Sequence, residues 1–344
     1  MPQDSPDRRT IEAAVALATR APSIHNAQPW RWAIGDSSVH LFADRERSLP
    51  AIDPDDRDLL MGCGAALHHL RVALAALGWA TTAHRLPNPA EPDHLAAVTF
   101  RPRQATADDI ALAAAIPHRR TDRRRFSSWP VPTDLVDELA ERASHEGVVA
   151  IAATDPRDRF RLTSSLTEAA WRQGMDAAYA VELAAWSGRG GGAVDGVPAA
   201  NTPSTPVRHG DVVMRTFPGG ALGAGTTEDG DDGEEDAGEL LVLATTSDDR
   251  ISRLRAGEAL SAVLLAATDF RLATCPLSQP VEVADVRRAL RDDVLDGVAH
   301  PQILIRVGWA PVGGEPLPAT PRRPLSEVLG GYPSPHAAHL GGAR

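Results

Sequence analysis

A short segment near the N-terminus, Ala21-Pro-Ser-Ile-His-Asn-Ala-Gln-Pro-Trp30, gathers side chains that are well suited to hold a small ligand. Pro22 and Pro29 restrict its backbone angles, so the segment should form a stiff loop. Asn26 and Gln28 each offer a donor and an acceptor, which suits a planar heterocycle or a polyol. The alternative is an ordinary helix-to-strand turn, and for the tryptophans around its end we favour a place in the core.

A second segment, His118-Arg-Arg-Thr-Asp-Arg-Arg-Arg-Phe126, contains five arginines, and Pro321-Arg-Arg-Pro324 adds two more. Guanidinium groups bind phosphate through paired hydrogen bonds, and a threonine hydroxyl adds a donor. The formal net charge is −11, but eight acidic residues lie between Glu228 and Glu239, so the rest of the chain is nearly neutral. The cluster therefore suggests one small anion, such as a cofactor phosphate. A solvated basic turn is the alternative.

A third segment, Leu272-Ala-Thr-Cys-Pro-Leu-Ser-Gln-Pro280, is bounded by proline and should form an irregular loop that presents backbone N–H groups. We interpret Cys275 as an inert small hydrophobe, because nothing near it in the sequence lowers its pKa. His68 and His69 have no cysteine or carboxylate at metal-ligand spacing, so we interpret them as packing or surface residues. No metal site is predicted.

Composition excludes several classes of protein. The chain has 344 residues, 43% apolar and 24% charged, which is typical of a globular protein with a sizeable core. Its two cysteines exclude a disulfide framework. No apolar stretch reaches the roughly 20 residues of a membrane span, and the first residues lack the pattern of a signal peptide. We expect a soluble cytoplasmic protein that binds neither membranes nor nucleic acid.

Apolar periodicity and turn residues outline the elements that must position these segments. Helices are predicted over residues 10–20, 56–77, 132–144, 156–185, 251–269 and 284–291. Strands are predicted over residues 30–34, 39–42, 81–85, 96–101, 148–153, 240–245 and 302–308. Residues 187–238 are rich in glycine, proline and acid and read as an insertion with a solvated acidic run.

Two helical segments resemble each other at a constant offset of 193 residues. Gly64-Ala-Ala-Leu-His-His-Leu-Arg-Val-Ala73 aligns with Gly257-Glu-Ala-Leu-Ser-Ala-Val-Leu-Leu-Ala266, and both helices follow an Asp-Asp-Arg tripeptide. Chance similarity of Ala-rich helices is the alternative. An internal duplication would make the chain a single-chain pseudo-dimer.

Within the insertion, only residues 211–217 are apolar enough to pack on the body. We expect Val212, Val213, Met214 and Phe217 to lie over or beside a ligand pocket as a lid.

Together these segments resemble the nitroreductase family of flavoproteins. Residues 21–30 are similar to its Ser-x-x-Asn-x-Gln-Pro-Trp segment, and Arg119-Arg-Thr-Asp-Arg123 is similar to its Arg-x-Ser-x-Arg phosphate motif. The segments 272–280, 303–309 and 321–325 resemble its C-terminal half. The order of the motifs, the internal repeat and the length are similar to the Acg family of FMN-binding nitroreductases.

The resemblance implies an α+β fold, a three-layer α-β-α sandwich that is internally duplicated. Residues 1–115 would form the first half, and residues 116–344 the second half with a flexible insertion at 187–238. A family homodimer shares its FMN sites between subunits, so here the two halves would build them within one chain. A monomer is then plausible. Only one set of motifs is complete, because the counterpart sites hold only Asp7-Arg-Arg-Thr10 and Asn201-Thr-Pro, so we expect one FMN.

The resemblance also assigns residues to the FMN, with no dedicated catalytic acid or base, since the hydride chemistry belongs to the flavin. The implied FMN-binding residues are Pro22, Ser23, Asn26, Gln28, Arg119, Thr121, Arg123, Pro276, Leu277, Ser278, Arg322 and Arg323. The phosphate would lie at the first two motif positions and the C-terminal arginines, and Arg123 at the pyrimidine edge. In an alternative register the motif begins at Arg120 and places Asp122 and Arg124 in these roles.

The implied activity is an FMN-dependent oxidoreductase that transfers hydride from NAD(P)H to a nitroaromatic or quinone-like acceptor. An alternative is a flavin store whose insertion covers the FMN and excludes the nicotinamide. A third possibility is a structural protein with a relic site.

Overall fold

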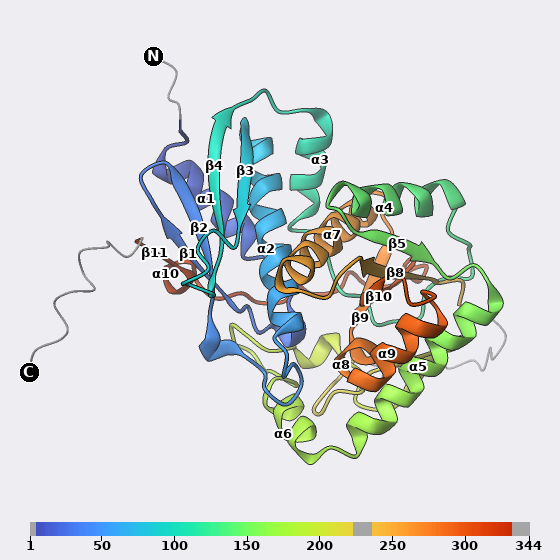
Figure 1. The fold of residues 1–344 in the computed structure, drawn as a ribbon. Helices are drawn as coiled ribbons and strands as arrows, with labels where there is room; N and C mark the ends of the chain where they lie inside the picture. The colour runs from blue at the N-terminus through green and yellow to red at the C-terminus, as the bar shows by residue number, and fades with distance from the viewer. Residues whose placement is uncertain (1–4, 223–235, 332–344) are drawn as a thin grey trace, which may run out of the picture.

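The structure, a computed structural model, describes residues 5–222 and 236–331 and has an α+β fold. Two long helices, α2 (Arg57–Ala76) and α7 (Arg250–Asp269), lie side by side between two sheets (Figure 1). Each packs on its own sheet, so the interior has one apolar cluster around each helix. The α+β prediction is confirmed.

All but one of the described strands of the first sheet come from the N-terminal third of the chain. Its elements are α1 (Arg8–Ala18), β1 (Trp30–Ile34), β2 (Ser38–Ala43), α2, β3 (Trp79–Arg85), β4 (His94–Pro102) and α3 (Ala107–Ala115). Side chains of β2 alternate between buried and half-buried, as expected for a sheet with helices on one face. Trp30 and Trp32 are fully buried on that face, which confirms their interpretation as core residues.

The second sheet has helices on both faces. Its elements are α4 (Thr133–His145), β5 (Val149–Ala152), α5 (Pro156–Gly174), α6 (Ala177–Ala185), β8 (Glu239–Thr245), α7, β9 (Ala273–Leu277), α8 (Gln279–Glu282), α9 (Ala284–Asp293) and β10 (His300–Gly308). Helices α4 and α7 cover one face, and α5 and α9 cover the other. The three-layer arrangement is therefore found in this half, whereas helices cover one face of the first sheet.

The two sheets have the same strand order. The first runs β1-β2-β4-β3 and the second β5-β8-β10-β9, and every neighbouring pair in both runs is antiparallel. After the second sheet the chain returns to the first, where α10 (Leu325–Val328) leads into β11 (Leu329–Gly331), which pairs in parallel with β1. The C-terminal segment thus lies against the first half.

Helices α2 and α7 meet through one glycine each. A methyl group at Gly64 would lie 2.0 Å from the carbonyl oxygen of Leu254, and one at Gly257 would lie 2.0 Å from that of Met61. Leu254 and Met61 are themselves separated by the offset of 193 residues, so the contact is reciprocal, as in a two-fold interface. Glycine is required at both positions because the backbones touch.

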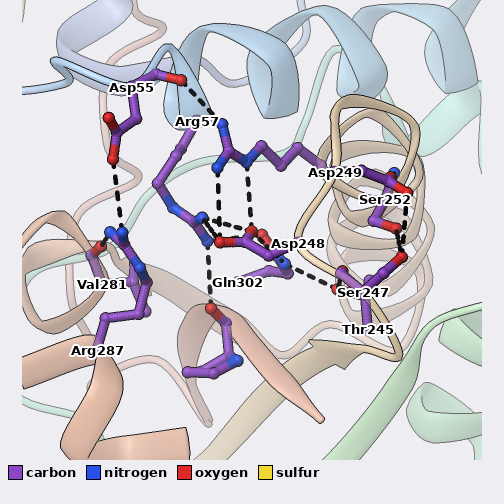
Figure 2. Close-up of polar contacts among 12 residues, drawn as sticks. Asp55, Arg57, Thr245, Ser247, Asp248, Asp249, Ser252, Val281, Arg287 and Gln302 are labelled. Atoms are coloured by element: carbon purple, nitrogen blue, oxygen red, sulfur yellow. Dashed lines mark hydrogen bonds and ion pairs between the residues drawn. The ribbon is translucent and has the colours of Figure 1, made fainter. Parts of the chain in front are cut away.

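A polar cluster joins the halves where these helices begin (Figure 2). Arg57 at the start of α2 donates to Asp248 just before α7 and to Gln302 of β10, and Arg253 donates to the backbone oxygen of Asp55. Burial opposes ionisation of Asp248, but the hydrogen bonds from the guanidinium groups hold the pKa of this carboxyl well below its usual range. The cluster fixes the relative position of the two helix starts.

Four local predictions are corrected. The helix predicted over residues 156–185 is two helices, because the Asp176 side chain caps the start of α6. Helix α3 was not predicted, and residues 272–280 form strand β9 and the start of α8 rather than an irregular loop. Outside residues 211–217 the insertion also forms strand β6 (Val207–His209), which pairs with β7 (Val212–Met214).

Helix α2 is the one described helix that is long and apolar enough to span a membrane, and 83% of the qualifying window is buried inside the protein. Its apolar character serves the packing against α7 and the first sheet.

Candidate functional site

A pocket of about 760 Å³, which includes open space at its mouth, lies between the two halves. The first half contributes the loop after α1 and the first turns of α2. The second half contributes the segment after α3, the end of β9 and part of α7, and the insertion contributes the segment after β7. Its lining residues are Pro22, Ser23, Ile24, His25, Asp58, Met61, Gly62, Thr121, Arg123, Met214, Arg215, Phe217, Leu260, Cys275, Pro276, Leu277, Ser278, Gln279 and Ile303. Seven of the twelve residues assigned by the resemblance are among them.

A second, basic pocket adjoins the arginine segment. It is lined by Arg20, Ile116, Arg119, Arg120, Ala319, Thr320 and Arg322, with no carboxylate in the set. Burial and the neighbouring Arg120 and Arg20 lower the pKa of Arg119 to about 10, and burial beside Arg119 lowers the pKa of Arg322 to about 9. The Nε and Nη1 atoms of Arg119 are buried without a partner among the described residues. Such an arrangement calls for an anion.

One stretch of chain connects the two pockets. Arg119 and Arg120 line the basic pocket, whereas Thr121 and Arg123 line the large one. Since consecutive Cα atoms lie about 3.8 Å apart, the pockets are close neighbours. Asp122 pairs with Arg124 at 2.6 Å and lines neither pocket, so the geometry favours the register that begins at Arg119.

The Asn-Gln loop is placed differently from the expectation. The backbone φ angles are positive at His25, Asn26 and Gln28, at 44°, 55° and 54°. Residues other than glycine rarely adopt this backbone conformation. The Asn26 amide donates to the backbone oxygens of Gly196 and Pro321, and the Gln28 amide donates to that of Val194. The amides therefore attach the loop to the insertion and the C-terminal segment, and neither side chain lines the large pocket or the basic pocket.

The two C-terminal arginines, Arg322 and Arg323, lie in different environments. Arg322 lines the basic pocket and donates to the last carbonyls around the end of α1, those of Thr19, Arg20 and Ala21. Arg323 instead pairs with Asp44 at 3.2 Å, and its backbone N–H donates to the Gln28 side chain. Arg323 therefore lies outside both pockets, because a carboxylate of the first half holds it.

The insertion lies against the large pocket as predicted, with two changes, since neither Val212 nor Val213 lines it. Met214 and Phe217 line the pocket, and Arg123 lies 4.9 Å from the centre of the Phe217 ring. Val212 is instead buried in the apolar cluster beneath the second sheet. Most of the acidic run lies outside the described residues, but Asp236 is buried in an ion pair with Arg306, which corrects the prediction of a wholly solvated run.

The sequence alone gave no reason to assign several of the pocket residues to a binding site. Arg215 pairs with Glu282 of α8 and approaches His25 Nε2 at 3.0 Å. Burial, with Arg215 and Arg123 nearby, lowers the pKa of His25 well below its usual value, so the ring is neutral. Asp58 lines the same pocket from the first turn of α2. These residues meet only because the insertion and α8 fold against α2.

Three residues already interpreted as packing are buried, as expected. Burial raises the pKa of Cys275, in agreement with an inert thiol. The Nδ1 atoms of His68 and His69 each lie 2.7 Å from the Ser261 hydroxyl oxygen. In the described part of the chain, no group of three or more His, Cys, Asp or Glu side chains is placed to hold a metal.

The position related to Ser278 by the 193-residue offset is Arg85, at the end of β3. Instead of lining a cavity, Arg85 pairs at 2.6 Å with Glu258 of α7, which is fully buried and also pairs with Arg71. An ion cluster therefore occupies this position, whereas Ser278 at the aligned position lines the large pocket.

Glu258→Gln is expected to lower the free energy of unfolding by about 3 kcal/mol, because two largely buried guanidiniums lose a shared counter-ion. Urea unfolding of the purified variant measures the loss. Glu138→Gln on α4 is the control: Glu138 pairs with Arg142 at the surface, and its loss should cost less than about 1 kcal/mol. Equal stability of the two variants would contradict the structural role of the cluster.

The chain matches no protein-family model. It is 44% identical over 327 residues to "Putative NAD(P)H nitroreductase Rv3131" of Mycobacterium tuberculosis, covering 94% of this chain and 92% of the relative. It is 41% identical over 332 residues to "Putative NAD(P)H nitroreductase acg" of the same organism, covering 96% and 98%.

Solved structures show more distant likenesses. A nitroreductase with bound FMN from Bacteroides fragilis aligns with a TM-score of 0.36 and 13% identity, covering 59% of this chain and 90% of that chain. The NADPH:FMN oxidoreductase of Vibrio harveyi, complexed with NAD+, aligns with a TM-score of 0.34 and 14% identity, covering 62% and 74%. From its identity to two relatives over more than nine-tenths of each chain, this protein belongs to the nitroreductase family of oxidoreductases.

Proposed function

We propose that the protein binds one FMN between its two halves and transfers hydride from NAD(P)H to a nitroaromatic or quinone-like acceptor. The observation that carries the proposal is the basic pocket beside the large pocket, where Nε and Nη1 of Arg119 are buried with no partner among the described residues. Family membership supplies the reaction type, and the names of the relatives suggest the nicotinamide donor.

The residues fit a phosphate at one end and a flavin ring at the other. Arg119 would donate to the phosphate from its buried Nε and Nη1, which have no partner among the described residues. Arg322 would add its positive charge, because its nitrogens already donate to backbone oxygens and no carboxylate lines the pocket. Thr121 at the junction would donate its hydroxyl. Arg323, Asn26 and Gln28 would act indirectly, by holding the loop and the C-terminal segment in place.

In the large pocket, apolar side chains from both halves would exclude water from the ring. When bound, FMN would supply the hydride chemistry. Arg123 lines the pocket as a half-buried cation and would favour negative charge on the pyrimidine edge. Ser23 and Pro22 face the segment Pro276, Leu277 and Ser278 across the same pocket, and these residues would orient the ring.

We infer that the site arose in a duplicated chain, with halves at residues 1–115 and 116–344 and the insertion at 187–238. The matching strand orders and the reciprocal glycine contact support this inference. Because both halves of the site come from one chain, a monomer is sufficient, and the buried Glu258 cluster supports one FMN per chain rather than two. We place the protein in the cytoplasm, in agreement with the burial of α2.

An anaerobic titration of the purified protein with NADPH tests the proposal. A yellow protein with one FMN per chain, whose flavin absorbance bleaches on addition of NADPH or NADH, is the expected result. A colourless protein that FMN does not saturate would contradict the site assignment.

A second candidate function is flavin storage, and the insertion favours it. Met214, Arg215 and Phe217 line the pocket, and the insertion is anchored to the first half by an ion pair between Asp195 and Arg47 at 2.6 Å. A yellow protein that nicotinamides do not bleach would support storage over reduction.

Phe217→Ala is expected to speed FMN reduction by NADPH about tenfold or more if the insertion restricts access, because an open state is otherwise a minor population. Stopped-flow absorbance under anaerobic conditions measures the rate. Val213→Ala in β7 is the matched control, since Val213 does not line the pocket. An unchanged rate in Phe217→Ala, with full flavin content, would remove the structural basis for storage.

A further inference from the structure

Asp58 is a buried carboxyl group that faces the large pocket from the first turn of α2. Its residue exposure is 6%, and Ser278 and Gln279 line the same pocket. The carboxyl accepts no side-chain hydrogen bond from the residues that the structure describes, so its state depends on the surrounding charges.

The two guanidiniums near Asp58 are committed to other partners. Arg57 donates to Asp248 and Gln302 (Figure 2). Arg215 pairs with Glu282. Neither cation forms an ion pair with Asp58, although both act on it at longer range.

The start of α2 does not stabilise an anion at Asp58 either. A helix N-terminus favours a carboxylate, but here Asp53 already accepts from the backbone N–H groups of Arg57 at 2.7 Å and Leu59 at 2.8 Å. A second carboxylate beside it is repelled. The charged and titratable groups around Asp58 are Asp53, Arg57, Tyr179, Arg215 and Glu282. Burial first, and then Asp53 and Glu282, raise the pKa of Asp58 well above its usual value, whereas Arg57 and Arg215 oppose this rise.

We propose that Asp58 is a neutral carboxylic acid that donates a proton to the acceptor during its reduction. The proposal rests on the proposed function, which supplies the hydride and its electron pair to the acceptor. For a quinone, the hydride and the Asp58 proton together give the hydroquinone. Asp58 remains as a carboxylate, and solvent at the mouth of the pocket returns the proton.

The first test determines whether Asp58 is neutral in the folded protein, from the pH dependence of the protein's stability. The unfolded chain loses the Asp58 proton above about pH 4, whereas the folded wild type retains it, so wild-type stability falls with rising pH relative to Asp58→Asn. The Tm of D58N relative to wild type should therefore increase by about 2 to 4 °C between pH 5 and pH 8. A D58N variant that loses stability relative to wild type as pH rises would overturn the proposal.

Asp56→Asn is the matched control. Asp56 precedes α2 by one residue, points to the partly exposed Arg45, and has a φ angle of 54°, which asparagine tolerates well. Its Tm difference from wild type should increase with pH far less than that of D58N, because Asp56 acts only weakly on the pKa of Asp53. Full FMN content in both variants shows that the pocket is intact.

The second test measures proton donation without NAD(P)H. Holoprotein reduced with dithionite is mixed anaerobically with a quinone, and flavin reoxidation is followed. D58N should reoxidise about 100-fold more slowly, whereas D56N should match the wild type. The wild-type rate should also fall at high pH as Asp58 ionises, a step that D58N lacks. An unchanged D58N rate overturns the proposal. Absence of bleaching by NAD(P)H, with this D58N effect present, would contradict only the proposed nicotinamide step.

Discussion

Gly64→Ala is expected to lower the free energy of unfolding by more than about 3 kcal/mol, a loss that few single substitutions cause. The new methyl group would lie 2.0 Å from the carbonyl oxygen of Leu254, on the backbone of α7. Backbone atoms cannot rotate away as a side chain can, so the two central helices would have to separate. Equilibrium unfolding in urea measures the loss.

Because the contact between α2 and α7 is reciprocal, the corresponding substitution at Gly257 belongs to the same test. Gly257→Ala should cost about as much as Gly64→Ala, because its methyl group meets the carbonyl oxygen of Met61 at the same distance. Gly174→Ala near the end of α5 is the control: no atom lies within 4 Å of the added group, and alanine favours a helix over glycine by about 1 kcal/mol. Wild-type stability of Gly64→Ala would refute the close crossing.

Arg119→Met is expected to weaken FMN binding about 100-fold and leave riboflavin binding unchanged, because hydrogen bonds to charged groups contribute about 1.5 to 3 kcal/mol each. The same change should stabilise the flavin-free protein by about 1 to 3 kcal/mol, since it removes a buried cation whose Nε and Nη1 have no partner in residues 5–222 and 236–331. Opposite effects on binding and stability distinguish a ligand site from a structural arginine.

Fluorescence titration with FMN and riboflavin, and urea unfolding of the flavin-free protein, provide the two measurements. Arg101→Met is the control, because Arg101 is exposed on β4 and lines neither pocket. An equal loss of affinity for FMN and riboflavin would contradict the phosphate role of Arg119. A destabilised flavin-free variant would show that its guanidinium has a structural partner.

The sequence determined the elements that depend on local pattern. Apolar periodicity located α2 and α7 to within a residue or two, and alternation located most strands of both sheets. The constant offset of 193 residues paired Gly64 with Gly257, and the structure then showed that each glycine contacts the backbone of the other helix. Short motifs likewise located Pro22 and Ser23, Thr121 and Arg123, and the end of β9, which all line the large pocket. The backbone position of these residues is restricted locally, by the prolines of the first loop and by the end of strand β9.

Only the tertiary structure decided where individual side chains point and what surrounds them. Asn26 and Gln28 turn toward the insertion because the loop adopts positive φ angles, and the backbone oxygens that receive their amides lie more than 160 residues away. Arg323 faces Asp44 rather than the basic pocket because the segment that follows it pairs with β1 of the first sheet. In the sequence, Asp58 is part of an ordinary helical turn and Arg215 is part of the insertion, so neither residue stands out as a site residue. Their burial and charge arise from contacts among α2, α8 and the segment after β7, and no local pattern encodes contacts over such separations.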